Sequence, residues 1–129
     1  MDQDKKCVLI VDDTPSYIAL LNFILQEQYA VKGVPKGKLA LQIVQKEPAA
    51  VDLILLDIVM EGMNGFEVCQ ILQAEPTTKH IPIIFISGKE DATDQAKGLA
   101  LGAVDFILKP FSAKIVLEKV AQHLKGVEK

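Results

Sequence analysis

The acidic residues of greatest chemical interest follow two apolar runs, at residues 7–11 and 53–56. Asp12 and Asp13 come directly after the first run, and Asp57 comes directly after the second. Three carboxylates that meet in a fold repel one another and favour a hard divalent cation, of which Mg²⁺ suits a small site because it keeps several waters. A carboxylate can also attack a phosphoryl group and form an aspartyl phosphate. We therefore expect a Mg²⁺ site at these acids and a phosphoacceptor at Asp57.

Ser87 and Lys109 stand at the ends of two further apolar runs, at residues 81–86 and 104–108. A lysine ammonium and a serine hydroxyl can both contact phosphate oxygens, and positive charge stabilises the group that is transferred in phosphoryl transfer. Each residue alone also has a structural explanation, since Asp or Ser after a strand can cap a helix and Lys can be a solvated surface residue. The joint placement of these residues after four of the five apolar runs favours a common site.

The elements that must position these residues follow from the alternation of five short apolar runs with helix-patterned stretches. Three of the runs are nearly continuous Val, Ile, Leu and Phe, which is typical of strands covered on both faces in a parallel sheet. The predicted strands are residues 7–11, 29–34, 53–56, 81–86 and 104–108. The alternation predicts an α/β fold: a doubly wound, flavodoxin-like sheet of five parallel strands in the order 2-1-3-4-5, with helices on both faces. In that order a crevice opens between strands 1 and 3, where the three acids would converge.

Five helices are predicted from capping residues, prolines and apolar periodicity. The Thr14 hydroxyl would cap the first helix, which Pro15 opens and which runs to about residue 28. The others span residues 38–46, residue 64 to a stop at Pro76, residues 92–101, and the stretch after residue 112. Their expected apolar faces hold Val68, Ile71 and Leu72 in the third helix; Ala92, Ala96, Leu99 and Ala100 in the fourth; and Leu117, Val120, Ala121 and Leu124 in the last. Residues 1–129 are predicted to form one domain, with short tails at about residues 1–5 and 126–129.

The composition argues against several classes of partner. The net charge is −3 and all 14 cationic residues are lysines, so neither a bulk positive field nor an arginine clamp would attract nucleic acid or an anionic membrane. No apolar run is long enough to cross a bilayer, and the first residues lack the pattern of a secretory signal. Cys7 and Cys69 lie in apolar segments without metal-binding spacing, as expected for free thiols in a reducing compartment. We expect a cytoplasmic protein with no direct contact to nucleic acid or membrane.

These motifs together resemble the receiver domain of bacterial two-component response regulators, of the kind found in chemotaxis regulators, over nearly all of the chain. The resemblance rests on residues 8–13 (VLIVDD), 57–65 (DIVMEGMNG), 81–87 (IPIIFIS), 102–103 (GA) and 109–111 (KPF). It implies that Asp57 takes a phosphoryl group, in a Mg²⁺-dependent reaction, from the phosphohistidine of a sensor histidine kinase or a histidine phosphotransfer protein. The changed surface would then control a downstream protein or a fused output domain.

The resemblance also implies a role for each site residue. The implied Mg²⁺ ligands are Asp12, Asp13, Asp57 and the backbone carbonyl of Val59. Ser87 and Lys109 would contact the phosphoryl group, and the Lys109–Pro110 peptide bond would be cis. Phe106 occupies the aromatic switch position of the family, where the ring turns inward when the hydroxyl of Ser87 moves to the phosphate. The surface that changes would be that of the fourth helix, the fifth strand and the fifth helix.

Several positions depart from the usual pattern of the family. Glu61 stands where the loop usually has proline, Lys38 where an acid is more common, and Gly88 where alanine is common. Val59 and Lys89 occupy variable positions that the family uses to tune the access of water to the phosphoryl group. None of these differences removes a required functional group.

Three alternative functions fit a sheet of this type. A phosphatase that works through an aspartyl phosphate would need a general acid two residues after the nucleophile, where this chain has Val59. A nucleotide-binding module would need a glycine-rich phosphate loop, and the Asp12-Asp13 pair would repel phosphates. A degenerate receiver could serve as a docking module without phosphorylation, although all five site residues are present. Neither His80 nor His123 lies where a relay would need it, so we expect a phosphoacceptor with no enzymatic activity beyond its own phosphorylation and dephosphorylation.

Overall fold

The computed structural model of this chain describes residues 5–88 and 92–124. Apart from Lys5, the predicted tails at residues 1–5 and 126–129 lie outside the described residues, as does Lys89. The strands are β1 (Cys7–Val11), β2 (Ala30–Val34), β3 (Leu53–Asp57), β4 (Ile83–Ser87) and β5 (Asp105–Leu108). The helices are α1 (Pro15–Leu25), α2 (Gly37–Lys46), α3 (Gly65–Ala74), α4 (Ala92–Ala100) and α5 (Ala113–Leu124), with a 3₁₀ turn, η2, at Pro48–Ala50.

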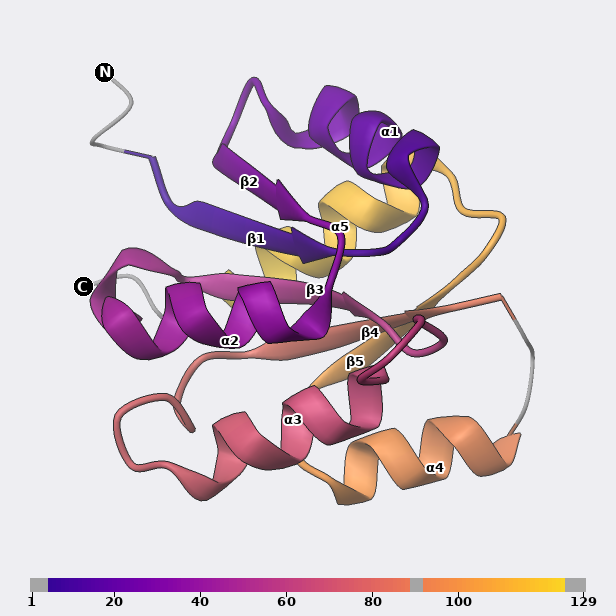
Figure 1. Ribbon diagram of the computed structural model, residues 1–129. Helices are drawn as coiled ribbons and strands as arrows, with labels where there is room; N and C mark the ends of the chain where they lie inside the picture. Colours follow the sequence, from indigo (N-terminus) through magenta and orange to yellow (C-terminus); the bar gives the residue numbers. More distant parts are fainter. Residues whose placement is uncertain (1–4, 89–91, 125–129) are drawn as a thin grey trace.

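The strands form one parallel sheet in the order β2-β1-β3-β4-β5, which confirms the predicted doubly wound topology. The chain passes from β1 to β2 on one side and returns to β3 on the other, so β1 and β3 are neighbours. Leu9, in the middle of β1, stands between Lys32 of β2 and Ile54 of β3. The carboxyl ends of the strands therefore lie along one edge of the sheet (Figure 1).

Helices cover both faces of the sheet, with α1 and α5 on one face and α2, α3 and α4 on the other (Figure 1). Successive side chains of a strand point to opposite faces, so each strand contributes to two apolar layers. On β1, Val8 and Ile10 pack in the layer of α1 and α5, whereas Leu9 and Val11 pack in the other layer. Because both faces are covered, the inner strands need apolar residues at every position, which explains the nearly continuous runs of the sequence.

Two of the predicted site residues belong to strands rather than to the loops that follow them. β3 extends through Asp57 and β4 extends through Ser87, one residue beyond each apolar run. In the sheet, Asp57 pairs with Ile86 and Ser87 pairs with Leu108, so backbone pairing fixes the position of both residues. At their beginnings, β2 and β5 start one residue later than predicted, and β4 starts two residues later.

The first helix differs from the prediction at both ends. Thr14 precedes α1, but its side chain makes no capping hydrogen bond, and the predicted hydroxyl cap is wrong. Instead, Oδ1 of Asp12 accepts a hydrogen bond from the backbone N–H of Thr14 at 2.9 Å. The helix ends at Leu25 rather than near residue 28 because the N–H groups of Gln28 and Tyr29 both bond to the Leu25 carbonyl in a turn that leads into β2.

The buried faces of the last two helices also differ from the predicted ones. α5 buries Val116, Val120 and Leu124, whereas Leu117 and Ala121 are only half-buried. In α4, the apolar side chains of Ala96, Leu99 and Ala100 are exposed, and among residues 93–100, whose burial is described, Gly98 is the buried one. The side chain of Ala92 lies outside the described residues. Periodicity predicted Val120 and Leu124 of the α5 face correctly, but the rotation of each helix depends on what the sheet presents beneath it.

Two expectations from composition can also be compared with the structure. Cys7 and Cys69 are free thiols, and burial raises the pKa of Cys69 to about 11, as expected for an inert core residue. Within the described part of the chain, no helix combines the length and apolar character that a membrane span requires.

Candidate functional site

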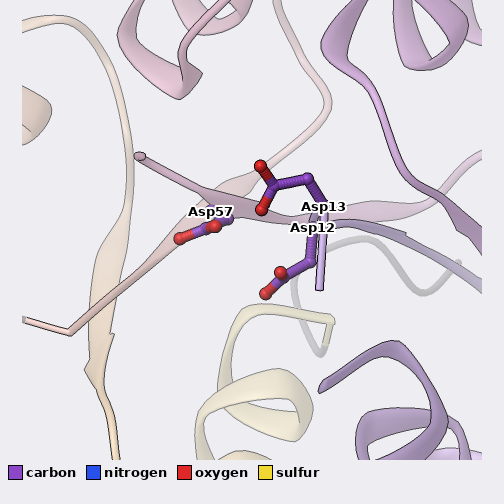
Figure 2. A group of neighbouring side chains, drawn as sticks. All are labelled: Asp12, Asp13 and Asp57. Atoms are coloured by element: carbon purple, nitrogen blue, oxygen red, sulfur yellow. The ribbon is translucent and has the colours of Figure 1, made fainter. Parts of the chain in front are cut away.

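Asp12, Asp13 and Asp57 meet at the carboxyl edge of the sheet, where the predicted topology places them. One carboxylate oxygen from each residue lies within 4.8 Å of the others. Figure 2 shows the three side chains gathered in one place, at the carboxyl ends of the neighbouring strands β1 and β3. Asp12 and Asp57 are buried, with 1% and 5% of their surface exposed, whereas Asp13 is exposed. Asp13 is therefore the acid through which the cluster meets solvent.

The electrostatics of this cluster favour a bound cation. The pKa of the Asp57 carboxyl is raised to about 6, first by burial and then by the neighbouring charge of Asp12, with Asp13 acting in the same direction. The charge and hydrogen bond of the Lys109 ammonium oppose this rise. Since three carboxylates exceed the charge of one ammonium, a divalent cation between them would favour the ionised form of Asp57. All the side-chain donors are hard oxygens, which fit Mg²⁺.

Lys109 reaches the acids from the end of β5. Its Nζ atom lies 3.2 Å from Oδ2 of Asp12 and 3.6 Å from Oδ1 of Asp57. The Lys109–Pro110 peptide bond is cis, as the resemblance implies. The backbone N–H of Lys109 donates to the carbonyl of Ser87 at 2.8 Å, so the positions of the lysine and the serine are linked. The structure thus brings Asp12, Asp13 and Lys109 together around Asp57, and joins Ser87 to Lys109 through the backbone.

Ser87 and Phe106 lie on neighbouring strands. Ser87 is buried at the end of β4, one residue beyond the partner of Asp57 in the sheet. Phe106, on β5, pairs with Phe85 of β4, and the ring centroids are 5.6 Å apart. Phe106 is 9% exposed and packs in the layer covered by α2, α3 and α4, so its ring points inward. A Cβ atom built on Gly88 would meet no described atom within 4 Å, so the position beside Ser87 is open.

The loop after β3 is held against the acids by its backbone. The N–H of Glu61 donates to Oδ2 of Asp13 at 3.1 Å, a contact that a proline at this position could not make. A Cβ atom on Gly65 would collide with the backbone carbonyl of Asp57, so α3 can begin this close to Asp57 only with glycine. The Val59 side chain is 71% exposed beside this loop.

Tyr17 is a neighbour of the site that the sequence motifs do not single out. Nζ of Lys109 lies 3.9 Å from the centroid of its ring, and the ring also packs against Phe111. One feature of the sequence does point to this contact. Tyr17 is an aromatic residue one helical turn after Asp13, at the start of a helix that begins at the site. In such an apolar helix, however, an aromatic residue is more simply explained as part of the core.

Comparisons with known proteins agree with this geometry. The sequence model of the family described as "Response regulator receiver domain" matches residues 8–121. The "Probable cyclic di-GMP phosphodiesterase" of Vibrio cholerae is 42% identical over 98% of this chain, which corresponds to 28% of that protein. The "DNA-binding response regulator MtrA" of Mycolicibacterium smegmatis is 35% identical over 99% of this chain and 54% of its own length. This chain therefore spans about half or less of these relatives.

Among solved structures, the fold is similar to that of the chemotaxis protein CheY4 of Vibrio cholerae. The two chains superpose with a TM-score of 0.83 and are 30% identical, over 93% of this chain and 98% of the other. The shared architecture is the sheet and helix arrangement that places the acids at one edge.

Proposed function

This chain belongs to the response regulator receiver domain family, which makes it a phosphorelay signalling module, and we propose that Asp57 is its phosphoacceptor. The observation that carries this proposal is the position of Asp57: a buried carboxylate between two further acids and 3.6 Å from the Lys109 ammonium. The phosphoryl donor would be the phosphohistidine of a sensor histidine kinase or of a histidine phosphotransfer protein.

The proposed reaction is a single phosphoryl transfer. An Asp57 carboxylate oxygen attacks the phosphorus atom, the N–P bond of the donor breaks, and the imidazole nitrogen leaves with the bonding electrons. Lys109 would contact the transferred oxygens by charge, which its distance of 3.6 Å from Asp57 supports. The Ser87 hydroxyl would contact them by a hydrogen bond, which the position of Ser87 at the end of β4 supports. The acceptor must be ionised to attack, which the raised pKa of Asp57 opposes. A cation at the acid cluster would remove that obstacle.

We propose Mg²⁺ as this cation, held by Asp12, Asp13, Asp57 and the backbone carbonyl of Val59. The oxygen cluster within 4.8 Å and its excess negative charge support the assignment of the three carboxylates. When bound, Mg²⁺ would supply charge stabilisation to the transferred group. The exposed Asp13 is the ligand best placed to share the ion with water.

The output would pass through the surface of α4, β5 and α5. Ser87 and Phe106 would couple the phosphoryl site to this surface, because they lie on the adjacent strands β4 and β5. Leu99, Val104 and Ile115 expose 51%, 41% and 40% of their area there, which suits a protein partner or a fused output domain. We place the domain, residues 1–129, in the cytoplasm, without direct contact to nucleic acid or membrane.

The test is phosphorylation of Asp57. Incubation with acetyl phosphate, or with a phosphorylated kinase, plus Mg²⁺ should add one acid-stable, base-labile phosphate, seen by mass spectrometry, and Asp57→Asn should abolish it. Asp52→Asn is the matched control, because Asp52 stands directly before the same strand at the opposite edge of the sheet. Labelling of Asp57→Asn at the wild-type level would refute the assignment. A wild-type protein that takes up no phosphate and does not bind beryllofluoride would favour the docking module.

A further inference from the structure

Tyr17, in the first turn of α1, lies against the ammonium group of Lys109. Nζ of Lys109 is 3.9 Å from the ring centroid, well inside the limit of about 6 Å for a cation–π contact. We infer that Tyr17 is a positioning residue for phosphoryl transfer, whose ring face keeps the Lys109 ammonium beside Asp57. This inference rests on the proposed roles of Asp57 and Lys109.

The place of the Tyr17 ring is fixed from two sides. The backbone N–H of Tyr17 donates to the carbonyl of Thr14 at 3.0 Å, which holds the residue in the turn directly after the acidic pair. The ring also packs on Phe111, with centroids 5.9 Å apart and planes tilted by 48°. Tyr17 therefore contacts the residues on both sides of Pro110 and joins the loop between β5 and α5 to α1.

The ring differs in kind from the two carboxylates that lie beside the ammonium. Oδ2 of Asp12 accepts a hydrogen bond from Lys109 at 3.2 Å, whereas Oδ1 of Asp57 forms an ion pair with the ammonium at 3.6 Å. The ring attracts the whole charge through its quadrupole and needs no directed hydrogen bond. The three donors of the ammonium thus remain available for oxygen atoms. A ring contact can hold the lysine in place without competing with a phosphoryl group.

Burial and flexibility make such a contact useful. The Lys109 side chain is only 12% exposed, and cation–π attraction grows when the ammonium is shielded from water. Lysine has a long, flexible stem, so an ammonium without a restraint would lose more entropy on reaching a transferred phosphoryl group. When that group joins Asp57, its oxygens draw the ammonium away from Asp12, while the broad ring face permits a small displacement. Loss of the ring should slow the transfer even though every reacting group remains.

The kinetic test compares three variants with acetyl phosphate as donor and saturating Mg²⁺. Tyr17→Leu should lower the maximal rate constant of phosphorylation by roughly three- to tenfold, the range expected for a partly buried cation–π contact. Tyr17→Phe keeps the ring and should restore most of the rate. Phe23→Leu, an aromatic-to-leucine change at a 72% exposed position of the same helix, is the control and should match the wild type.

The outcomes separate this inference from the proposed function. If the wild type is labelled at Asp57 and Tyr17→Leu is labelled equally fast, Tyr17 has no positioning role. Equal slowing in Tyr17→Leu and Tyr17→Phe would assign the effect to the hydroxyl and overturn the role of the ring face. A wild type that is not labelled contradicts the proposed function itself.

A spectroscopic test does not depend on the folding of Tyr17→Leu. Protons of the Lys109 side chain above the ring face should be shifted upfield by the ring current, in the wild type and in Tyr17→Phe. The shift should disappear in Tyr17→Leu or, if that variant does not fold, in Tyr17→Met. Side-chain protons of Lys109 at ordinary lysine positions in the wild type would overturn the inference.

Discussion

A Cβ atom on Gly98 of α4 would lie 2.9 Å from two ring atoms of Phe106 and 2.8 Å from one ring atom of Phe85. Helix α4 therefore crosses the paired rings of β4 and β5 at a residue that has no side chain. The inward position of the Phe106 ring and the position of α4 depend on each other, because one can be occupied only if the other leaves room. This contact links the proposed aromatic switch to the proposed output surface.

Gly98→Ala should lower the free energy of unfolding by about 1 kcal/mol, because overpacking of about 1–3 kcal/mol exceeds a gain in helix propensity of about 0.8–1 kcal/mol. Urea denaturation measures the change. In a Phe106→Leu background one of the two rings is removed, so the same alanine should cost less, although a ring atom of Phe85 still lies 2.8 Å from its Cβ. An equal loss in both backgrounds would show that the Phe106 ring is not what residue 98 must avoid.

Asp57→Asn should stabilise the fold at neutral pH. The pKa of the folded carboxyl is raised to about 6, whereas an unfolded Asp titrates near 3.9, so the folded state binds the proton more tightly. Ionised Asp57 therefore costs stability, and the cost grows as the pH rises from about 4 through about 6. We expect the variant to gain roughly 1–2 kcal/mol at neutral pH and nothing below about pH 4, by urea unfolding in a chelator. A gain that does not change with pH would have another cause.

Mg²⁺ should raise the melting temperature of the wild type. A ligand that binds only the folded state stabilises it by about 1.4 kcal/mol at ten times its dissociation constant. The shift should be strongly reduced in Asp57→Asn and retained in Asp52→Asn, where the exchanged side chain instead accepts the N–H of Cys7 at the far edge of the sheet. If Asp57→Asn shifts as far as the wild type, the ion binds elsewhere.

The sheet and the acid cluster could be predicted because each strand, and the polar residue at its end, can be recognised within its own short segment of sequence. A nearly continuous apolar run marks a covered strand, and a polar residue directly after it must lie at the carboxyl edge. Asp57 and Lys109 were placed correctly by this rule alone. The rule also tolerates small errors of boundary, since a strand that extends one residue further still brings Asp57 to the same edge.

Helix rotation and ring contacts could not be predicted in the same way. Val116 is buried in place of Leu117 because both are apolar and only the shape of the sheet decides between them. Gly98 of α4 is buried because two rings lie beneath it, although periodicity favours its larger neighbours. The contact of Tyr17 with Lys109 joins the beginning of α1 to the end of β5. It depends on the packed arrangement of both segments, which no local pattern contains.

Asp105→Asn should have the opposite effect to Asp57→Asn, although the chemical change is the same. Partial burial alone would raise the pKa of Asp105, but hydrogen bonds from Lys119, His123 and the Phe106 N–H outweigh it and lower the pKa. Nζ of Lys119 lies 2.7 Å from one carboxylate oxygen and Nε2 of His123 lies 3.0 Å from the other. Because the folded pKa lies below the unfolded one, ionised Asp105 stabilises the fold above about pH 4, and this stability is lost as the pH falls through the folded pKa.

The Asp105→Asn variant should therefore lose about 1 kcal/mol of unfolding free energy at neutral pH, a value kept small because the pair with Lys119 is partly exposed. Urea unfolding over a pH series should show the deficit shrinking in acid. Lys119→Gln should produce part of the same deficit, since it removes the ammonium that donates to Asp105. A variant at position 105 as stable as the wild type at neutral pH would mean that these contacts contribute nothing net. In that case Asp105→Asn would not show the loss of stability that should distinguish it from Asp57→Asn.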